Sequence, residues 1–139
     1  MGYGADIGRT YVVGKTLAPV RAAIYETLWA AYDIGLEMLG PGVMPGDMFS
    51  RMMERIRKDI PPYNRSHFGH SSGCVQGEEY PFIATSNPKP FAPGMVFCME
   101  TPYYSVNNSS FNIEDTFLIT ENGYERFTTA SRSLFWPEK

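Results

Sequence analysis

The sequence predicts an α+β fold in which helices cover one face of an antiparallel sheet, and three observations predict it. In the first half of the chain, apolar residues recur at three- and four-residue steps, as in amphipathic helices. In the second half, apolar residues alternate with polar ones, as in half-buried strands. An Asn-Gly pair near residue 122 marks a tight hairpin turn. We therefore expect a strand, then two helices, then several strands.

Two amphipathic helices are expected between residues 16 and 58. From Thr16 to Leu39 the apolar side chains form one stripe, which ends at Gly40-Pro41-Gly42. A second helix is expected from Pro45 to about Lys58, because the Pro61-Pro62 pair cannot continue it. Flexible thioethers suit irregular helix packing, so the following residues of its apolar face are expected in the core: Met48, Met52 and Ile56.

The strands are expected on both sides of these helices. Before them, Ala5 to Val13 has the composition of a strand. After them, Met95 to Glu100 and Phe111 to Ile119 alternate as strands do, and the Asn122-Gly123 turn leads to a short strand from Tyr124 to Phe127. We treat residues 1–139 as a single domain.

Composition and charge exclude several classes of partner. The net charge is −3 and the basic residues are scattered, so no nucleic acid is expected. No apolar run approaches the length of a membrane span, and the first residues do not resemble a signal peptide, so we expect a cytoplasmic protein that does not contact membranes. Cys74 and Cys98 lack metal-site spacing and are expected to be reduced thiols without a chemical role.

Two carboxylates interrupt otherwise apolar strands. Alternation places Glu100 on one strand face with Val96 and Cys98. It places Glu114 on a face shared with Thr116 and Leu118. A carboxylate in such a strand either faces solvent or is paired with a positive group. Buried together without a cation, the two would repel and raise one pKa, which a metal ion would prevent.

Two further polar residues are candidate ligands only as members of a group. Taken alone, Asp6 is a surface ion pair with Arg9, and His70 is a hydrogen-bonded loop or core histidine. Metal sites are recognised by clusters of ligand types, so Asp6, His70 and the two glutamates have to be considered together.

The segments around these residues resemble the successive motifs of the pita-bread metallopeptidases, which include aminopeptidase P, prolidase and methionine aminopeptidase, and of the related non-metal creatinase. The resemblance covers nearly the whole chain in the same order. It is carried by GADIGRTYVVG (4–14), GHSSG (69–73), PGMVF (93–97) with Glu100, IEDT (113–116) and ITENG (119–123).

The resemblance implies a metal-dependent exopeptidase of the Xaa-Pro type. Its ligands for one or two divalent ions (manganese, cobalt, iron or zinc) would be Asp6, His70, Glu100 and Glu114, with Asp6 and Glu114 in the bridging positions. Glu100 would also carry the proton during catalysis, and the substrate would be a small peptide or amide. His67 either lines the substrate pocket, in a catalytic role, or caps a loop.

The chain departs from the family pattern at three points. The family has a second aspartate about ten residues before the position of Asp6, which precedes the first residue here, so the second metal position lacks a ligand while the four named residues still form a complete set for one ion. The family histidine seven residues after His70 is replaced by Gly77, and Asn112 stands where many relatives have arginine. The alternatives are a non-catalytic fragment or interaction module, a relative that acts on a small non-peptide substrate, and an α+β domain without metal.

The resemblance also implies that the chain holds about one αβ half of the pita-bread domain and one strand of the other half. The edge strand from about Tyr3 to Val13 would then lack a partner and expose hydrogen-bonding groups. We expect the chain to form a homo-oligomer or to associate with a separate N-terminal portion.

Overall fold

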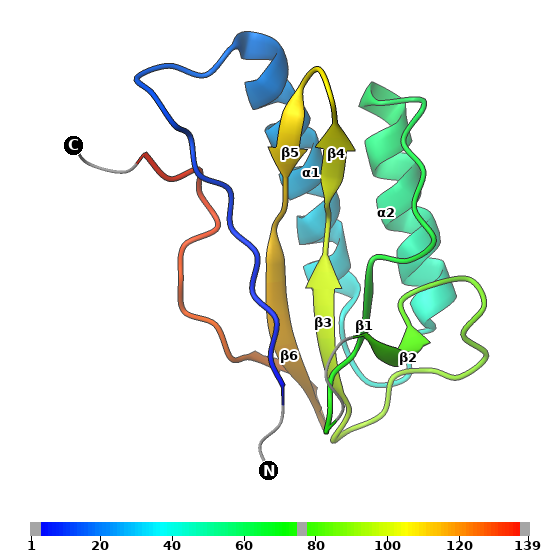
Figure 1. Cartoon of the computed structure of the whole chain (residues 1–139). Coiled ribbons are helices and arrows are strands. Elements are labelled where there is room, and N and C mark those ends of the chain that lie inside the picture. The colour runs from blue at the N-terminus through cyan, green and yellow to red at the C-terminus, as the bar shows by residue number, and fades with distance from the viewer. Residues whose placement is uncertain (1–3, 75–77, 137–139) are drawn as a thin grey trace.

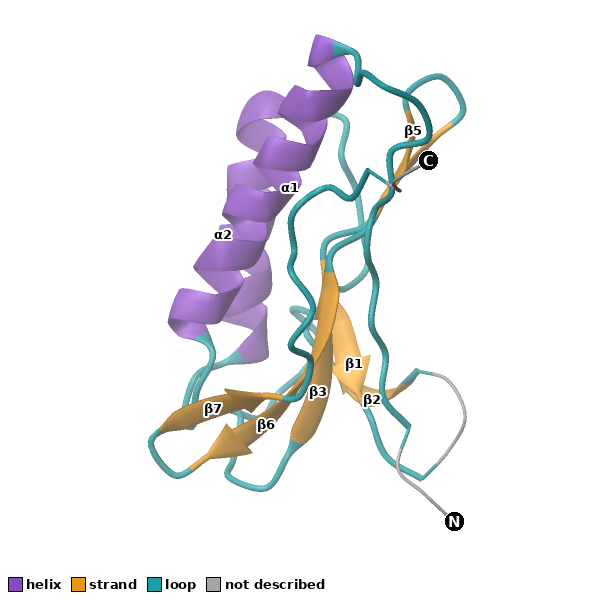
Figure 2. Cartoon of the chain, turned by 90° about the vertical axis from the view of Figure 1, so that its left-hand side faces the viewer, coloured by secondary structure: helices purple, strands orange, loops and turns teal. Residues whose placement is uncertain are grey.

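The two predicted helices pack together as one layer. The computed structural model describes residues 4–74 and 78–136, with α1 at Pro19–Met38 and α2 at Pro45–Asp59. Figure 2 shows both helices on the same side of the strands. The predicted start of the first helix at Thr16 is wrong: Ala18 is extended, as is usual for a residue before proline, and the helix begins at Pro19.

The strands form a five-stranded antiparallel sheet in the order β2-β1-β3-β6-β7. Its members are β1 (Gly69–Ser71), β2 (Glu79–Phe82), β3 (Val96–Glu100), β6 (Glu114–Thr120) and β7 (Gly123–Arg126). A separate two-stranded ribbon pairs β4 (Tyr103–Ser105) with β5 (Ser109–Phe111). Helices on one face of an antiparallel sheet are the α+β arrangement expected from the sequence (Figure 1).

Two predicted strands differ from the observed ones. The strand predicted from Phe111 to Ile119 is divided, because β5 ends at Phe111 and β6 begins at Glu114. The segment from Ala5 to Val13 is not a regular strand: it makes single bridges, from Gly8 to Glu114 and from Tyr11 to Phe135.

Side chains take the place of a continuous ladder along this segment. The Thr10 hydroxyl donates to the Asn112 carbonyl and accepts from the Asn112 N–H. A Cβ at Gly8 would lie 2.7 Å from the Asn112 side-chain nitrogen, so glycine allows this close approach. The expectation that the segment lacks a partner is wrong where Phe135 pairs with it; its Tyr3 end lies outside the described residues.

The core lies between the helices and the sheet. The three predicted core residues of α2 are fully buried, together with Leu28, Tyr32, Phe97, Met99 and Phe117. Gly35 of α1 makes room for this cluster, since a Cβ there would approach the Met99 sulfur to 2.6 Å. No helix in the described part of the chain is long and apolar enough to cross a membrane.

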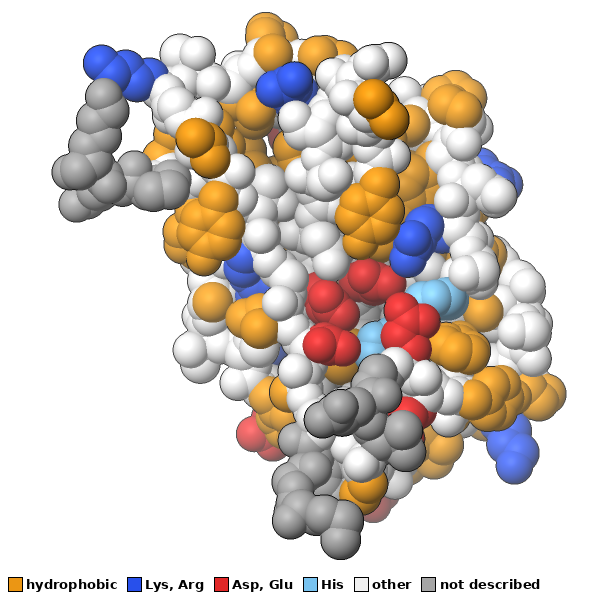
Figure 3. Space-filling view, in the orientation of Figure 1, with side chains coloured by type: hydrophobic (Ala, Val, Ile, Leu, Met, Phe, Trp, Pro, Cys, Tyr) orange, Lys and Arg blue, Asp and Glu red, His pale blue; other side chains and the backbone are white. Residues whose placement is uncertain are grey.

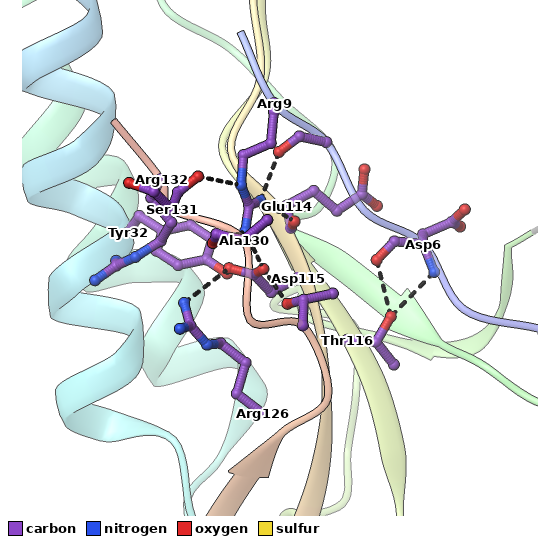
Figure 4. A network of polar contacts seen from close by, with 12 residues as sticks. Asp6, Arg9, Tyr32, Glu114, Asp115, Thr116, Arg126, Ala130, Ser131 and Arg132 are labelled. Atoms are coloured by element: carbon purple, nitrogen blue, oxygen red, sulfur yellow. Dashed lines mark hydrogen bonds and ion pairs between the residues drawn. The ribbon is translucent and has the colours of Figure 1, made fainter. Parts of the chain in front are cut away.

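The first residues are fixed to the sheet by a buried carboxylate on its helix-facing side (Figure 4). Asp115 of β6 is completely buried and accepts hydrogen bonds from Arg9 at 2.5 Å and from the Tyr32 hydroxyl at 2.8 Å. Thr128 donates to the same carboxylate, and Arg126 lies 3.7 Å from it. Arg9 also donates to backbone carbonyls of Glu114 and Ala130, so one guanidinium joins three parts of the chain.

Candidate metal centre

The four predicted ligands come from four segments that meet on the sheet face opposite Asp115. His70 lies in β1, Glu100 ends β3, Glu114 begins β6, and Asp6 lies in the extended N-terminal segment. Strand register brings them together, because Glu100 is directly opposite Glu114 and His70 is directly opposite Cys98. Figure 3 shows the acidic side chains gathered around the histidines on one face of the molecule.

His70 and Asp6 form the first part of the site. The His70 Nε2 lies 3.6 Å from Asp6 Oδ2, which is too long for a hydrogen bond, although the imidazole is only 2% exposed. The His70 Nδ1 is 3.0 Å from the Ser71 carbonyl, and this carbonyl can only accept a hydrogen bond. Nδ1 is therefore the donor in this contact, and Nε2 faces the Asp6 carboxylate, so a cation placed between these two atoms would be bound by both residues.

The position of Asp6 is set by its backbone. Its N–H donates to the Thr116 hydroxyl at 3.0 Å, and the same hydroxyl donates to the Asp6 carbonyl at 2.8 Å. Thr116 is fully buried, so this double contact fixes the main chain of Asp6 while its side chain stays free to turn toward a ligand.

Glu100 and Glu114 form the second part. The side-chain nitrogen of Asn112 lies 3.4 Å from Glu100 and 3.2 Å from Glu114, so one amide donates to both carboxylates. Burial, followed by the charges of Glu100 and Asp6, raises the pKa of Glu114 to about 7. Arg65 lies 3.2 Å from Glu100 and compensates only part of this negative charge. Such a donor set fits a divalent cation.

The donor atoms do not all converge on one point. Asp6, His70 and Cys98 each offer an atom within 4.8 Å of the others, and a second group has the same spacing: His67, Glu78 and Glu100. Glu114 belongs to neither group and is joined to Glu100 through Asn112. The described residues thus contain two adjacent donor groups on one face.

In the second donor group, His67 contacts Glu78 and Phe82. Its Nε2 lies 3.4 Å from Glu78, and its ring packs 5.0 Å from the ring of Phe82. Sequence reasoning missed Glu78, which no pattern in the chain marks as a site residue. It also missed Cys98, although strand alternation had placed that thiol on the face of Glu100. Gly77, the predicted departure from the family pattern, lies outside the described residues.

A cavity of about 320 Å³ is lined by Arg65, the residue that pairs with Glu100. Its lining includes Arg65, Tyr103 and Tyr104, and the Arg65 guanidinium lies 5.8 Å from the centre of the Tyr104 ring. The Arg65 Nε is buried without a hydrogen-bond partner among the described residues. Tyr103 and Tyr104 therefore line a space that Arg65 connects to Glu100.

The fold and the polar face of its sheet are those of a peptidase-family domain. The sequence profile of Metallopeptidase family M24 matches residues 1–121, and the chain belongs to this family. The structural neighbours described below share the pita-bread fold, which confirms the resemblance and the fold class expected from the sequence.

Several relatives are similar over nearly the whole chain. The Xaa-Pro dipeptidase of Pyrococcus furiosus is 34% identical over 133 residues, which are 95% of this chain and 38% of that enzyme. The dimethylsulfoniopropionate lyase DddP of Roseovarius nubinhibens is 32% identical over 138 residues, covering 92% of this chain and 30% of that protein. The chain thus spans about a third of the length of these relatives.

Solved structures give the same picture. The X-Pro aminopeptidase of Thermotoga maritima superimposes with a TM-score of 0.88 at 27% identity, covering 97% of this chain and 38% of that one. The prolidase of Pyrococcus furiosus has a TM-score of 0.85 at 33% identity, covering 94% of this chain and 38% of that one.

Proposed function

We propose that this chain provides the metal centre of a hydrolase that cleaves small peptides or amides of the Xaa-Pro type. The observation that carries the proposal is the presence of His70, Asp6, Glu100 and Glu114 on one face of the sheet, where burial and then the neighbouring carboxylates raise the pKa of Glu114 to about 7. The Xaa-Pro dipeptidases and prolidase among its relatives support the substrate class. Residues 1–139 would form part of one larger catalytic domain, and the cytoplasmic location stays a prediction.

The ion would be held by Asp6, His70, Glu100 and Glu114. Oxygen ligands with one imidazole suit manganese, cobalt, iron or zinc, in one or two copies. A bound divalent ion supplies Lewis acidity, which polarises a carbonyl and makes water a stronger nucleophile near neutral pH.

The protein side chains would position the substrate and move its proton. Glu100 accepts the proton of the attacking water and passes it to the leaving nitrogen. Arg65 holds Glu100 in place from the side of the cavity, and the cavity would accept a small side chain or proline of the substrate. His67, oriented by Glu78, would contact the substrate from the other side.

The metal-to-protein ratio of the purified chain tests this proposal. After incubation with manganese, cobalt or zinc and removal of loosely held ions, we expect a ratio near one, and near two if a second chain completes the site. Asp6→Asn and His70→Ala should each lower the ratio at least about tenfold. Glu37→Gln, an exposed carboxylate on α1, is the matched control and should retain the metal. A ratio near zero for the unaltered chain would reject the proposal.

A second candidate is cleavage of a small non-peptide substrate. It is favoured by the similarity to the dimethylsulfoniopropionate lyase and by Asn112, which supplies a neutral amide to both glutamates where many relatives have arginine. Comparing turnover of Xaa-Pro dipeptides with turnover of dimethylsulfoniopropionate by the metal-loaded chain separates the two candidates. Activity on the second substrate alone would replace the peptidase proposal.

We further propose that another polypeptide covers the N-terminal segment. Ile7, next to Asp6, is 52% exposed, and Val13 at the far end of the segment is 94% exposed, which leaves apolar surface along the segment. The partner would be a second copy of the chain or a separate N-terminal portion. Size-exclusion chromatography with light scattering should show a species larger than the 15.7 kDa monomer, and Ile7→Lys should shift it toward the monomer. A stable monomer at all concentrations would contradict self-association.

A further inference from the structure

Cys98 lies at the centre of the candidate site. It is the middle residue of β3, is fully buried, and is directly opposite His70 on β1 and Thr116 on β6. Directly opposite residues of neighbouring strands project to the same face of a sheet. Its Sγ lies 3.3 Å from the Thr116 hydroxyl, the same hydroxyl that fixes the backbone of Asp6. Thr116 therefore contacts both the Cys98 thiol and the backbone of Asp6, one of the predicted ligands.

The three donor atoms have the spacing of a metal site. Sulfur, imidazole nitrogen and carboxylate oxygen of Cys98, His70 and Asp6 lie within 4.8 Å of one another. Bond lengths of about 2.0–2.3 Å around a tetrahedral zinc ion separate neighbouring donors by about 3.3–3.6 Å. The observed 3.6 Å between His70 and Asp6 matches this separation without any movement.

His70 provides independent evidence for a ligand here. The imidazole is almost completely buried, yet its Nε2 makes no hydrogen bond shorter than 3.5 Å to a described residue. Its Nδ1 contacts the Ser71 carbonyl, which is the outer contact that commonly orients a metal-binding imidazole. The Nε2 faces Asp6, and Cys98 offers its sulfur to the same group of donor atoms.

We propose that Cys98 binds the metal as a thiolate, alongside Asp6 and His70, and that this sulfur ligand makes the site prefer zinc, cobalt or iron(II) over manganese. The inference rests on the proposed metal centre and adds a ligand to it. Binding releases the thiol proton to solvent and forms one sulfur–metal bond. Sulfur ligands favour zinc and similar ions, whereas manganese favours oxygen ligands, so the ligand set decides the ion.

X-ray absorption at the zinc edge of the unaltered, zinc-loaded chain tests the proposal without a mutation. We expect one sulfur neighbour at about 2.3 Å in addition to nitrogen and oxygen neighbours at about 2.0–2.2 Å. Bound zinc with nitrogen and oxygen neighbours only would overturn the role of Cys98 and leave the proposed metal centre intact. If manganese binds and zinc does not, the sulfur-ligand proposal fails and the proposed metal centre stands; only a chain that binds none of these ions rejects both.

Cobalt-loaded variants provide the second measurement. The unaltered chain should show a sulfur-to-cobalt charge-transfer band in the near ultraviolet, and Cys98→Ser should lose it. Cys74→Ser, the matched control at an exposed cysteine, should keep it. Cys98→Ser should also lower the preference for zinc over manganese by at least about tenfold. An unchanged band in folded Cys98→Ser protein would overturn the proposal.

Discussion

Asp115 and Glu114 are neighbours in β6, yet their carboxylates have opposite surroundings. Asp115 points toward the helices, where Arg9, Tyr32 and Thr128 all donate to it. Glu114 points to the other face, where its nearest charges are the carboxylates of Glu100 and Asp6. Burial and the contact with Asp115 raise the pKa of Tyr32, so its hydroxyl stays protonated and donates.

This difference distinguishes a carboxylate that stabilises the fold from one that is available to bind a ligand. Burying an ionised group is costly unless a positive group and hydrogen bonds accompany it. Asp115 has both within the chain. Among the described residues, Glu114 receives a side-chain hydrogen bond from Asn112 alone, and because it is half-buried the rest of its compensation comes from solvent, a proton or a cation. The following variants test this distinction, from the largest expected effect to the smallest.

Replacing the structural carboxylate should have the largest effect. Asp115→Ala leaves the Arg9 guanidinium, which is 5% exposed, without its charged partner. We expect a loss of about 3–5 kcal/mol in the free energy of unfolding, since a buried charge is then uncompensated. Urea denaturation measures it, with Glu37→Gln as the control. A loss below about 1 kcal/mol would show that Asp115 is not a structural anchor.

Replacing Glu114, the carboxylate proposed to bind metal, should increase the stability of the metal-free chain instead of lowering it. The pKa of Glu114 is raised in the folded protein from an ordinary 4.5 to about 7, so the folded state binds more protons than the unfolded state between these values. The stability of the metal-free chain therefore falls as the pH rises through this range. Glu114→Gln should remove this dependence and stabilise the metal-free chain at pH 8 by roughly 1–2 kcal/mol, allowing for solvent screening.

Denaturation of both proteins at pH 4 and pH 8 in the presence of a chelator provides the measurement for Glu114. Equal pH dependence of the two proteins would mean that Glu114 is already compensated within the chain. With metal added, the order should reverse, because the unaltered chain gains the free energy of ion binding.

Replacing Arg126, the more distant cation beside Asp115, should have the smallest effect on the free energy of unfolding. Arg126 lies 3.7 Å from Asp115 and its side chain is 33% exposed. Exposed or distant ion pairs contribute little, so Arg126→Gln should cost less than about 1 kcal/mol. A cost as large as that of Asp115→Ala would mean that Arg126, and not Arg9, is the main counter-charge.

The sequence predicts the elements of this fold better than their junctions. Periodicity predicted both helices and the hairpin turn, because these features depend on residues close in the chain. It did not predict the break between β5 and β6 or the irregular N-terminal segment. Both depend on contacts between Gly8 or Thr10 and residues around position 112, more than 100 positions away.

The candidate site shows the same limit. The family motifs pointed to Asp6, His70, Glu100 and Glu114, and the structure places them on one face; their role as ligands stays a prediction. Alternation had put Cys98 on the face of Glu100, but only strand register shows that it is opposite His70. The role of Asp115 depends on Arg9, 106 positions away, and no local pattern reveals this partner.

The double hydrogen bond between Asp6 and Thr116 joins residues 110 positions apart. Local opening of this contact would separate Asp6 from His70. An ion shared by these two residues acts as a reversible crosslink that closes a long loop and suppresses this opening. Cleavage by trypsin after the exposed Lys15 should therefore slow down when metal is added, so protease resistance would report occupancy of the site.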